Sequence, residues 1–274
     1  MPAATPVDRS DLIRPARLAR IDEVLTWRIG AAKPDTLFGD MGLIAAKLAR
    51  GEEAELCSRS VIALLEEPGS GPFWMFPSTC VAYLGRGQLS AEAQAAIRRG
   101  WRTTMQLRGD TENHWAMYYA SLYLMAQLYP NEAADTWYSG KTSTENFNEA
   151  RDYLIHWMDL ATTVGQGEFN PTHYIGEYAI PMMFLAAWAQ DPEMRIRGRM
   201  KLDWLLADLA EELGRGVAIE DGQRHRAAGA VHHITVAGCH ERSVPDDDVG
   251  REDDVGVAIS NGCRNVQAGD GQRW

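Results

Sequence analysis

The stretch that decides the fold spans residues 109–129 and reads GDTENHWAMYYASLYLMAQLY. Between His114 and Pro130 it contains no charged residue, and apolar or aromatic side chains fall on every face of the implied helix. A surface helix carries one apolar stripe, whereas a helix that is apolar all round is buried. The stretch therefore predicts an inner helix with a polar cluster at its N-terminal end.

A second nearly uncharged segment, 174–190, contains IGEYAIPMMFLAAWA, with Pro181 expected at a kink or in the first turn. Each inner segment is followed by a helix with a single apolar stripe, at 143–164 and at 193–213. This alternation predicts αα-hairpins. No period-two strand pattern is sustained before residue 217, so the sequence predicts an all-α fold. We expect an incomplete (α/α)6-type toroid of helical hairpins over residues 1–216, with inner helices lining a cavity.

The starts of several helices are marked by polar residues that accept hydrogen bonds from the first free backbone N–H groups. The expected N-caps are Asp35 or Asp40, Ser78 or Thr79, Ser90, and Ser143 or Thr144. The second helix is expected to end near Gly51, and the helix after Pro77 is expected to be short and buried.

Composition excludes some classes of protein. The chain has 274 residues, 45% apolar and 24% charged, with a formal net charge of −11. Nucleic-acid binding needs clustered Lys and Arg, so no nucleic-acid partner is expected. No apolar run of membrane-spanning length is present, so no membrane partner is expected. The first residues lack the apolar core of a signal peptide, which indicates a cytoplasmic protein as the sequence is written.

Residues 217–274 differ from the rest of the chain, since they contain no Leu, Phe, Tyr, Met or Lys. Such a segment cannot bury enough apolar surface to offset the entropy of ordering, so we expect a disordered or frame-shifted tail. His225, His232, His233 and His240 lie here with Cys239, but their spacing matches no tight zinc pattern.

The four cysteines of the chain include no CxxC pair, which favours free thiols. No metal site and no cofactor are expected.

Two polar segments precede the two inner helices, and we expect them to meet at one end of the fold. The first contains Asp110, Glu112, Asn113 and His114; the second contains Glu168, Asn170, His173, Tyr174, Glu177 and Tyr178. Parallel inner helices begin on the same side of a ring, and helix N-termini favour anionic groups. The sequence therefore predicts one shared site.

The segment Asn113-His114-Trp115, followed by Tyr118 and Tyr119, resembles the Asn-His-aromatic motif of alginate-lyase and heparinase-like polysaccharide lyases, which have an (α/α) toroid. The loop at 168–174, EFNPTHY, is similar to a Glu-Tyr-Asn-Ser-Pro-Thr-Tyr loop in uncharacterised bacterial toroid proteins of that superfamily. The resemblance covers roughly residues 100–213. It implies a secreted or periplasmic enzyme that acts on an oligo- or polysaccharide.

The resemblance implies β-elimination on a uronate-containing glycan. Asn113 would neutralise the uronate carboxylate, His114 would be the base or a second neutralising group, and Tyr174 or Tyr178 would be the base and acid. Two departures from the family pattern are visible: no Arg stands beside the tyrosine, and the ring is too short. Whether such a truncated copy is active stays open.

Two other functions remain open at this stage. Glycoside hydrolysis needs two carboxyl groups on opposite sides of the scissile bond. Asp110 or Glu112 from one segment and Glu168 or Glu177 from the other would supply them. The third alternative is a helical glycan-binding scaffold without catalysis.

Each candidate residue also has a structural interpretation, because Asp110 and Glu112 suit a helix start and His114 suits a buried core. The residues expected to bind substrate are Asp110, Glu112, Trp115, Tyr118, Asn170, His173 and Trp137.

Overall fold

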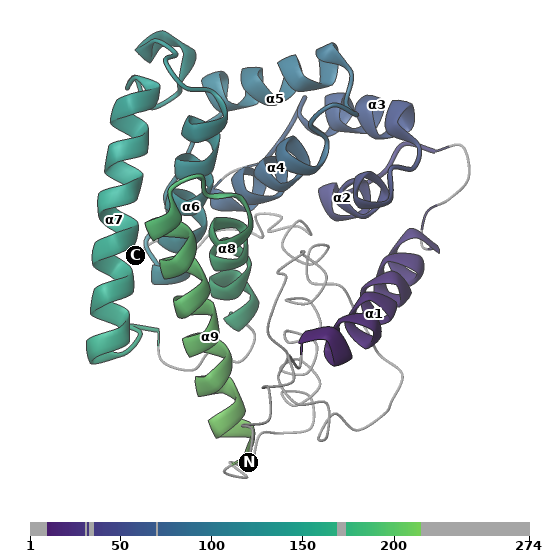
Figure 1. The fold of residues 1–274 in the computed structure, drawn as a ribbon. Coiled ribbons are helices and arrows are strands. Elements are labelled where there is room, and N and C mark those ends of the chain that lie inside the picture. Colours follow the sequence, from purple (N-terminus) through teal and green to yellow (C-terminus); the bar gives the residue numbers. More distant parts are fainter. Residues whose placement is uncertain (1–9, 31, 33–35, 70, 169–173, 215–274) are drawn as a thin grey trace, which may run out of the picture.

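The computed structural model describes residues 10–30, 32, 36–69, 71–168 and 174–214, and within them the chain is helical without any strand (Figure 1). The predicted all-α fold is therefore confirmed. The tail predicted at 217–274 lies outside the described residues. The helices are α1 Ser10–Gly30, α2 Met41–Arg50, α3 Ala54–Leu64, α4 Pro72–Leu84, α5 Ala91–Thr103, α6 Glu112–Leu128, the short 3-10 helix η1 Ala134–Thr136, α7 Ser143–Val164, α8 Ile175–Trp188 and α9 Pro192–Gly214.

The helices pack as two rows. In one row α2 contacts α4, α4 contacts α6, and α6 contacts α8. In the other, α3 contacts α5 and α7 contacts α9, and the rows are joined because α2, α6 and α8 each pack on the helix that follows them. Figure 1 shows α7 and α9 on the outside of α6 and α8. This arrangement brings the N-terminal ends of α6 and α8 together.

Burial separates the two kinds of helix as the sequence predicts. Met117, Tyr123 and Leu124 of α6 have no exposed surface, and α8 is buried from Ile175 to Leu185 apart from Glu177. In contrast, α7 buries one face and leaves Leu160 half exposed on the other. The uncharged helices are therefore the inner ones, which confirms this prediction for α6 and α8.

Close approach of α8 and α9 depends on Gly198. A Cβ at this position would lie 2.9 Å from the Cβ of Leu185 and 3.1 Å from the carbonyl oxygen of Met182. A larger residue would have to push the two helices apart. Pro181 lies inside α8 and not at its first turn.

Two predicted N-caps are confirmed. The Asp40 side chain accepts from the backbone N–H of Leu43, and Ser90 accepts from that of Ala93. These contacts satisfy backbone donors that a helix leaves free at its start.

Two predicted N-caps are wrong. Helix α4 begins at Pro72, so Ser78 and Thr79 lie inside it and donate to the Met75 carbonyl. A proline inside a helix removes one backbone hydrogen bond, but at Pro77 the packing of the apolar run outweighs this loss. The cap of α7 is Thr142, which forms a capping box with Glu145, whereas Ser143 donates to the Tyr129 carbonyl.

A small apolar cavity lies between α2, α4 and α8. Met41, Phe76, Ile180 and Phe184 help to line an apolar cavity of about 10 Å³. That is the space of about one water molecule, and the lining offers no polar group to hold a ligand. The cavity is too small for a sugar.

Candidate functional site

Asn113 joins the two polar segments. Its backbone N–H donates to Oε2 of Glu168 at 3.1 Å, and its side-chain Nδ2 donates to Oε2 of Glu177 at 2.6 Å. Its Oδ1 accepts from the Thr111 hydroxyl at 2.5 Å. Because Asn113 is the second residue of α6 and only 2% exposed, the helix end fixes both carboxyl groups in place.

Glu112 holds the loop before α8. Its Oε2 accepts from the backbone N–H of Glu168 at 3.0 Å, and its Oε1 accepts from Nε1 of Trp157 at 2.6 Å. A Cβ at Gly167 would lie 3.2 Å from the same Oε2, so the loop passes close to the carboxylate. The hydrogen bonds of Glu112 therefore connect α6 to α7 and to the loop before α8.

Tyr178 lies beneath these carboxylates and is fully buried. Its hydroxyl donates to Oε2 of Glu168 at 2.6 Å and approaches Oε2 of Glu112 at 3.4 Å. The ring stacks on Trp157, with centroids 6.1 Å apart. Burial raises the pKa of Tyr178, and the two carboxylates raise it further, so the hydroxyl stays a hydrogen-bond donor.

Glu177 differs from an ordinary surface carboxyl. Burial raises its pKa to about 7, and repulsion from Glu168 adds to this, although the hydrogen bond from Asn113 lowers it. A carboxyl with a pKa near neutrality holds a proton that it can give up, which is a property of general acids.

These residues form what we call the acidic cluster: Glu112, Asn113, Glu168, Glu177 and Tyr178. No Lys or Arg of the described chain forms an ion pair with its carboxylates. All three glutamates are half-buried and not sealed. The arrangement brings acidic groups together at a position that solvent reaches, and such groups are candidates for acid–base chemistry.

His114 does not join the acidic cluster. It is half-buried, with its ring edge-on to Phe73 at 5.1 Å between centroids. Its Nδ1 is buried and has no hydrogen-bond partner among the residues that the structure describes, and a Cβ at Gly109 would lie only 2.4 Å from it. The predicted pairing of His114 with Asn113 at one site therefore has no support in the geometry.

The aromatic side chains that were expected to bind substrate, Trp115, Tyr118 and Trp137, make their contacts outside the acidic cluster. Nε1 of Trp115 donates to the Gly109 carbonyl at 3.0 Å, and the Arg108 guanidinium covers its ring at 4.5 Å. Tyr118 packs edge-on against Tyr119, and burial raises its pKa to about 12. Trp137 is 3% exposed, and a buried ring offers no face to a sugar, so its assignment as a platform is corrected.

The remaining predicted residues have varied positions. Asp110 is exposed just before α6, and Tyr174 is half-buried just before α8, where its carbonyl accepts from the backbone N–H groups of Glu177 and Tyr178. Asn170 and His173 lie outside the described residues.

Sequence reasoning misses the roles of Trp157 and Lys201. Trp157 belongs to the apolar stripe of its helix, as the sequence predicts, but its indole N–H also binds Glu112. Lys201 lies on α9 with 1% of its surface exposed. No spacing rule picks out a single tryptophan or lysine on an outer helix, so neither has a signal in the sequence.

In the part of the chain that is described, no three His, Cys, Asp or Glu side chains are grouped to hold a metal ion, and no helix is long and apolar enough to cross a membrane. Comparison of the chain with protein-family models, with characterised proteins and with solved structures gives no match.

Proposed function

We propose that the chain is a carbohydrate-active enzyme that hydrolyses glycosidic bonds of a neutral oligo- or polysaccharide at the acidic cluster. The two rows of helices support an incomplete (α/α) toroid, because consecutive hairpins place alternate helices in an inner and an outer row. Such toroids host several chemistries, so the fold alone does not determine the reaction.

The observation that carries the proposal is the pair of carboxyl groups bound to Asn113. Glu177 is half-buried with a pKa raised to about 7, whereas Glu168 accepts hydrogen bonds from Tyr178 and the Asn113 N–H. A carboxylate accepts at both oxygens, and a protonated carboxyl has one donor. The two groups thus have the environments that an acid and a carboxylate partner need.

In this reaction the Glu177 proton goes to the leaving oxygen as the bond from that oxygen to the anomeric carbon breaks. Glu168 acts from its side as the carboxylate partner, either taking a proton from the attacking water or attacking the anomeric carbon itself. Asn113 keeps the two groups at a fixed separation, since it binds both of them.

Three features favour hydrolysis over the uronate elimination that the family resemblance implies. The three carboxylates would repel a uronate carboxylate. Both polar atoms of the Asn113 side chain already have partners, Glu177 and Thr111. The raised pKa of Tyr178 makes its hydroxyl a poor base. A neutral glycan avoids each of these costs.

The test is incubation of the full chain with a panel of neutral and uronate polysaccharides. We expect new reducing ends from a neutral glycan without the ultraviolet absorbance of an unsaturated uronate. Glu177→Gln and Glu168→Gln keep the shape of the site and should each lower kcat by about 100-fold or more. Glu55→Gln, on the exposed face of α3, is the matched control and should leave turnover unchanged.

Two outcomes would contradict the proposal. Unsaturated products would favour elimination, and glycan binding without any product would favour a scaffold. Full turnover in Glu177→Gln would remove this residue from the reaction even if hydrolysis is observed.

A further inference from the structure

Lys201 carries a positive charge that is buried in the fold. It lies on α9, its side chain is 1% exposed, and its Nζ contacts no acceptor among the described residues. An ammonium group has three N–H donors, and burying such a charge unpaired is costly. An unsatisfied group of this kind in a folded protein requires an explanation.

Two tryptophan rings surround the ammonium. Nζ lies 3.6 Å from the ring centroid of Trp204 and 5.2 Å from that of Trp157. The face of an indole carries negative charge density, so both rings attract the cation. The Trp157 ring also donates its Nε1–H to Glu112 at 2.6 Å. One indole therefore contacts a cation at its face and a carboxylate of the acidic cluster at its edge.

We infer that Lys201 is a positioning residue of the acidic cluster, because its ammonium over the Trp157 ring strengthens the hydrogen bond from Trp157 to Glu112. A cation at the ring face withdraws electron density and makes the indole N–H a better donor. Glu112 in turn binds the backbone of Glu168, so the effect reaches the proposed carboxylate partner. The effect on hydrolysis rests on the proposed function, but the effect on the hydrogen bond does not.

The charges around Lys201 agree with this role. Glu112 from α6 and Asp208 from α9 raise the pKa of Lys201, but burial dominates and lowers it to about 8. From α8 the neutral Tyr178 stacks on Trp157, and α7 contributes Trp157 itself. Lys201 therefore remains largely charged at neutral pH and loses its charge in mildly alkaline solution.

The experiment follows the indole N–H proton of Trp157 by NMR in the full chain, with the signal assigned among the nine tryptophans by Trp157→Phe. A short hydrogen bond moves such a proton downfield, so Lys201→Met should move it upfield. Lys201→Arg keeps a cation over the rings and should restore most of the shift. Lys141→Met, which removes the exposed partner of Glu149, is the control and should move nothing.

Titration of the wild-type protein is a second measurement that does not depend on a variant folding. The Trp157 signal should move upfield with a midpoint near pH 8, as Lys201 is neutralised, and Lys201→Met should lack this step. An unchanged Trp157 signal in a folded Lys201→Met protein, or equal shifts in Lys201→Met and Lys201→Arg, would overturn the inference and leave a packing role.

Activity gives an independent readout. Loss of the positive charge raises the pKa values of nearby carboxyl groups, so the pH–rate profile of Lys201→Met should move to higher pH. If no glycan is hydrolysed, the proposed function fails while the NMR result still decides the role of Lys201. If hydrolysis occurs and the Trp157 signal does not respond to Lys201, the inference fails alone.

Discussion

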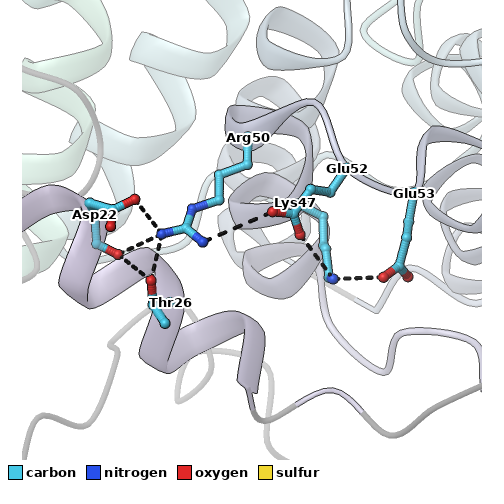
Figure 2. Close-up of polar contacts among 6 residues, drawn as sticks. All are labelled: Asp22, Thr26, Lys47, Arg50, Glu52 and Glu53. Carbon is cyan, nitrogen blue, oxygen red and sulfur yellow. Dashed lines mark hydrogen bonds and ion pairs between the residues drawn. The ribbon is translucent and has the colours of Figure 1, made fainter.

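Lys47 and Lys201 are buried to nearly the same extent, with 5% and 1% of their surface exposed, but their surroundings are opposite. Nζ of Lys47 donates to Glu53 at 2.7 Å and to Glu52 at 3.2 Å, as Figure 2 shows. Lys201 faces two indole rings, and its Nζ binds no carboxylate in the part of the chain that the structure describes. Lys47 belongs to one polar cluster and Lys201 lies beside another, the acidic cluster, and the two clusters differ in the same way.

The cluster around Lys47, which we call the paired cluster, joins α1, α2 and the start of α3. Its other cation, Arg50, donates to the backbone carbonyl of Asp22 at 2.7 Å and to the Thr26 hydroxyl at 2.5 Å (Figure 2). Each cation here has at least one carboxylate within ion-pair distance. The paired cluster is therefore sufficiently explained by its role in holding helices together.

Within the described residues, the acidic cluster has three carboxyl groups and no ion-paired cation, so folding alone does not explain its composition. Burial lowers the pKa of Lys47, but its hydrogen bonds to Glu53 and Glu52 raise it more, and the net shift is upward. For Lys201 the net shift is downward, and for Glu177 it is upward to about 7. The surroundings therefore disfavour the charged form of Glu177 in the acidic cluster and of Lys201 beside it. Such groups concentrate at functional sites.

The largest difference in stability between the two clusters is expected when a negative charge is added to each of them. Asn113→Asp places a carboxylate where Nδ2 now donates to Glu177, in a position only 2% exposed. We expect a loss of about 3 kcal/mol in the free energy of unfolding at pH 8, because an uncompensated buried charge is costly. At pH 5 the loss should be smaller, since one carboxyl group of the new pair is then protonated.

Thr26→Asp is the matched change in the paired cluster. Thr26 is exposed and its hydroxyl lies beside Arg50, so a carboxylate there gains a cation. We expect a change within about 0.5 kcal/mol, the range of exposed ion pairs. Urea unfolding of both variants at pH 5 and pH 8 measures the difference. Equal losses would mean that the two clusters do not differ in charge balance.

The next effect concerns the pH dependence of stability. The pKa of Glu177 is about 7 in the folded protein, against an ordinary value of 4.5. Between these values the folded protein keeps a proton that the unfolded chain has released, so stability falls as pH rises from 4.5 to 7. After allowance for partial exposure, this fall amounts to about 2 kcal/mol.

Glu177→Gln removes the titrating group and should make the stability profile flatter over that pH range. Glu55→Gln, at an exposed position, should keep the wild-type profile. Denaturant unfolding at several pH values between 4 and 8 gives the comparison. Parallel profiles for wild type and Glu177→Gln would show that Glu177 titrates normally.

The sequence predicts the fold well where a pattern extends over several turns. Residues 112–128 and 175–188 are uncharged enough to identify inner helices, and Asp40 and Ser90 identify two helix starts. Predictions of helix starts are wrong where they depend on one or two residues. Pro77 does not interrupt α4, because its neighbours are buried. Thr142 caps α7, just before the predicted caps Ser143 and Thr144.

The site is only partly predictable for the same reason. Asn113, Glu168 and Glu177 could be named because they lie at the ends of predicted inner helices, and α6 and α8 bring them together. His114 is adjacent in sequence but about 100° further round the helix, so it meets Phe73 instead. Lys201 on α9 contacts Trp157 on α7, which in turn binds Glu112 on α6. No local sequence pattern predicts contacts between helices so far apart in the chain.

Smaller effects than that of Asn113→Asp are expected when the same substitution is made at the two buried lysines. Lys47→Met removes two ion pairs, but Glu52 and Glu53 have side chains that are 40% and 47% exposed and regain water. We expect a loss of about 1.5 kcal/mol in the free energy of unfolding. Lys201→Met removes a charge that has no hydrogen-bond partner within the described ranges of the chain, and it leaves an apolar side chain between two indoles. We expect no loss, or a gain of up to about 1 kcal/mol, because replacing a poorly compensated buried charge with an apolar side chain is often stabilising.

Urea unfolding at pH 7 measures the change in the free energy of unfolding for each variant. The two changes are small, but they are expected to have opposite signs. A loss at Lys201 equal to that at Lys47 would mean that the cation–π contacts with Trp157 and Trp204 stabilise the ammonium as well as two carboxylates stabilise Lys47. In that case the buried lysine of α9 would be a structural element of the same kind as Lys47. If the signs differ, the ammonium of Lys201 beside the acidic cluster makes the fold less stable than an apolar side chain would. Such a cost is expected of a residue that is retained for the chemistry of its neighbours.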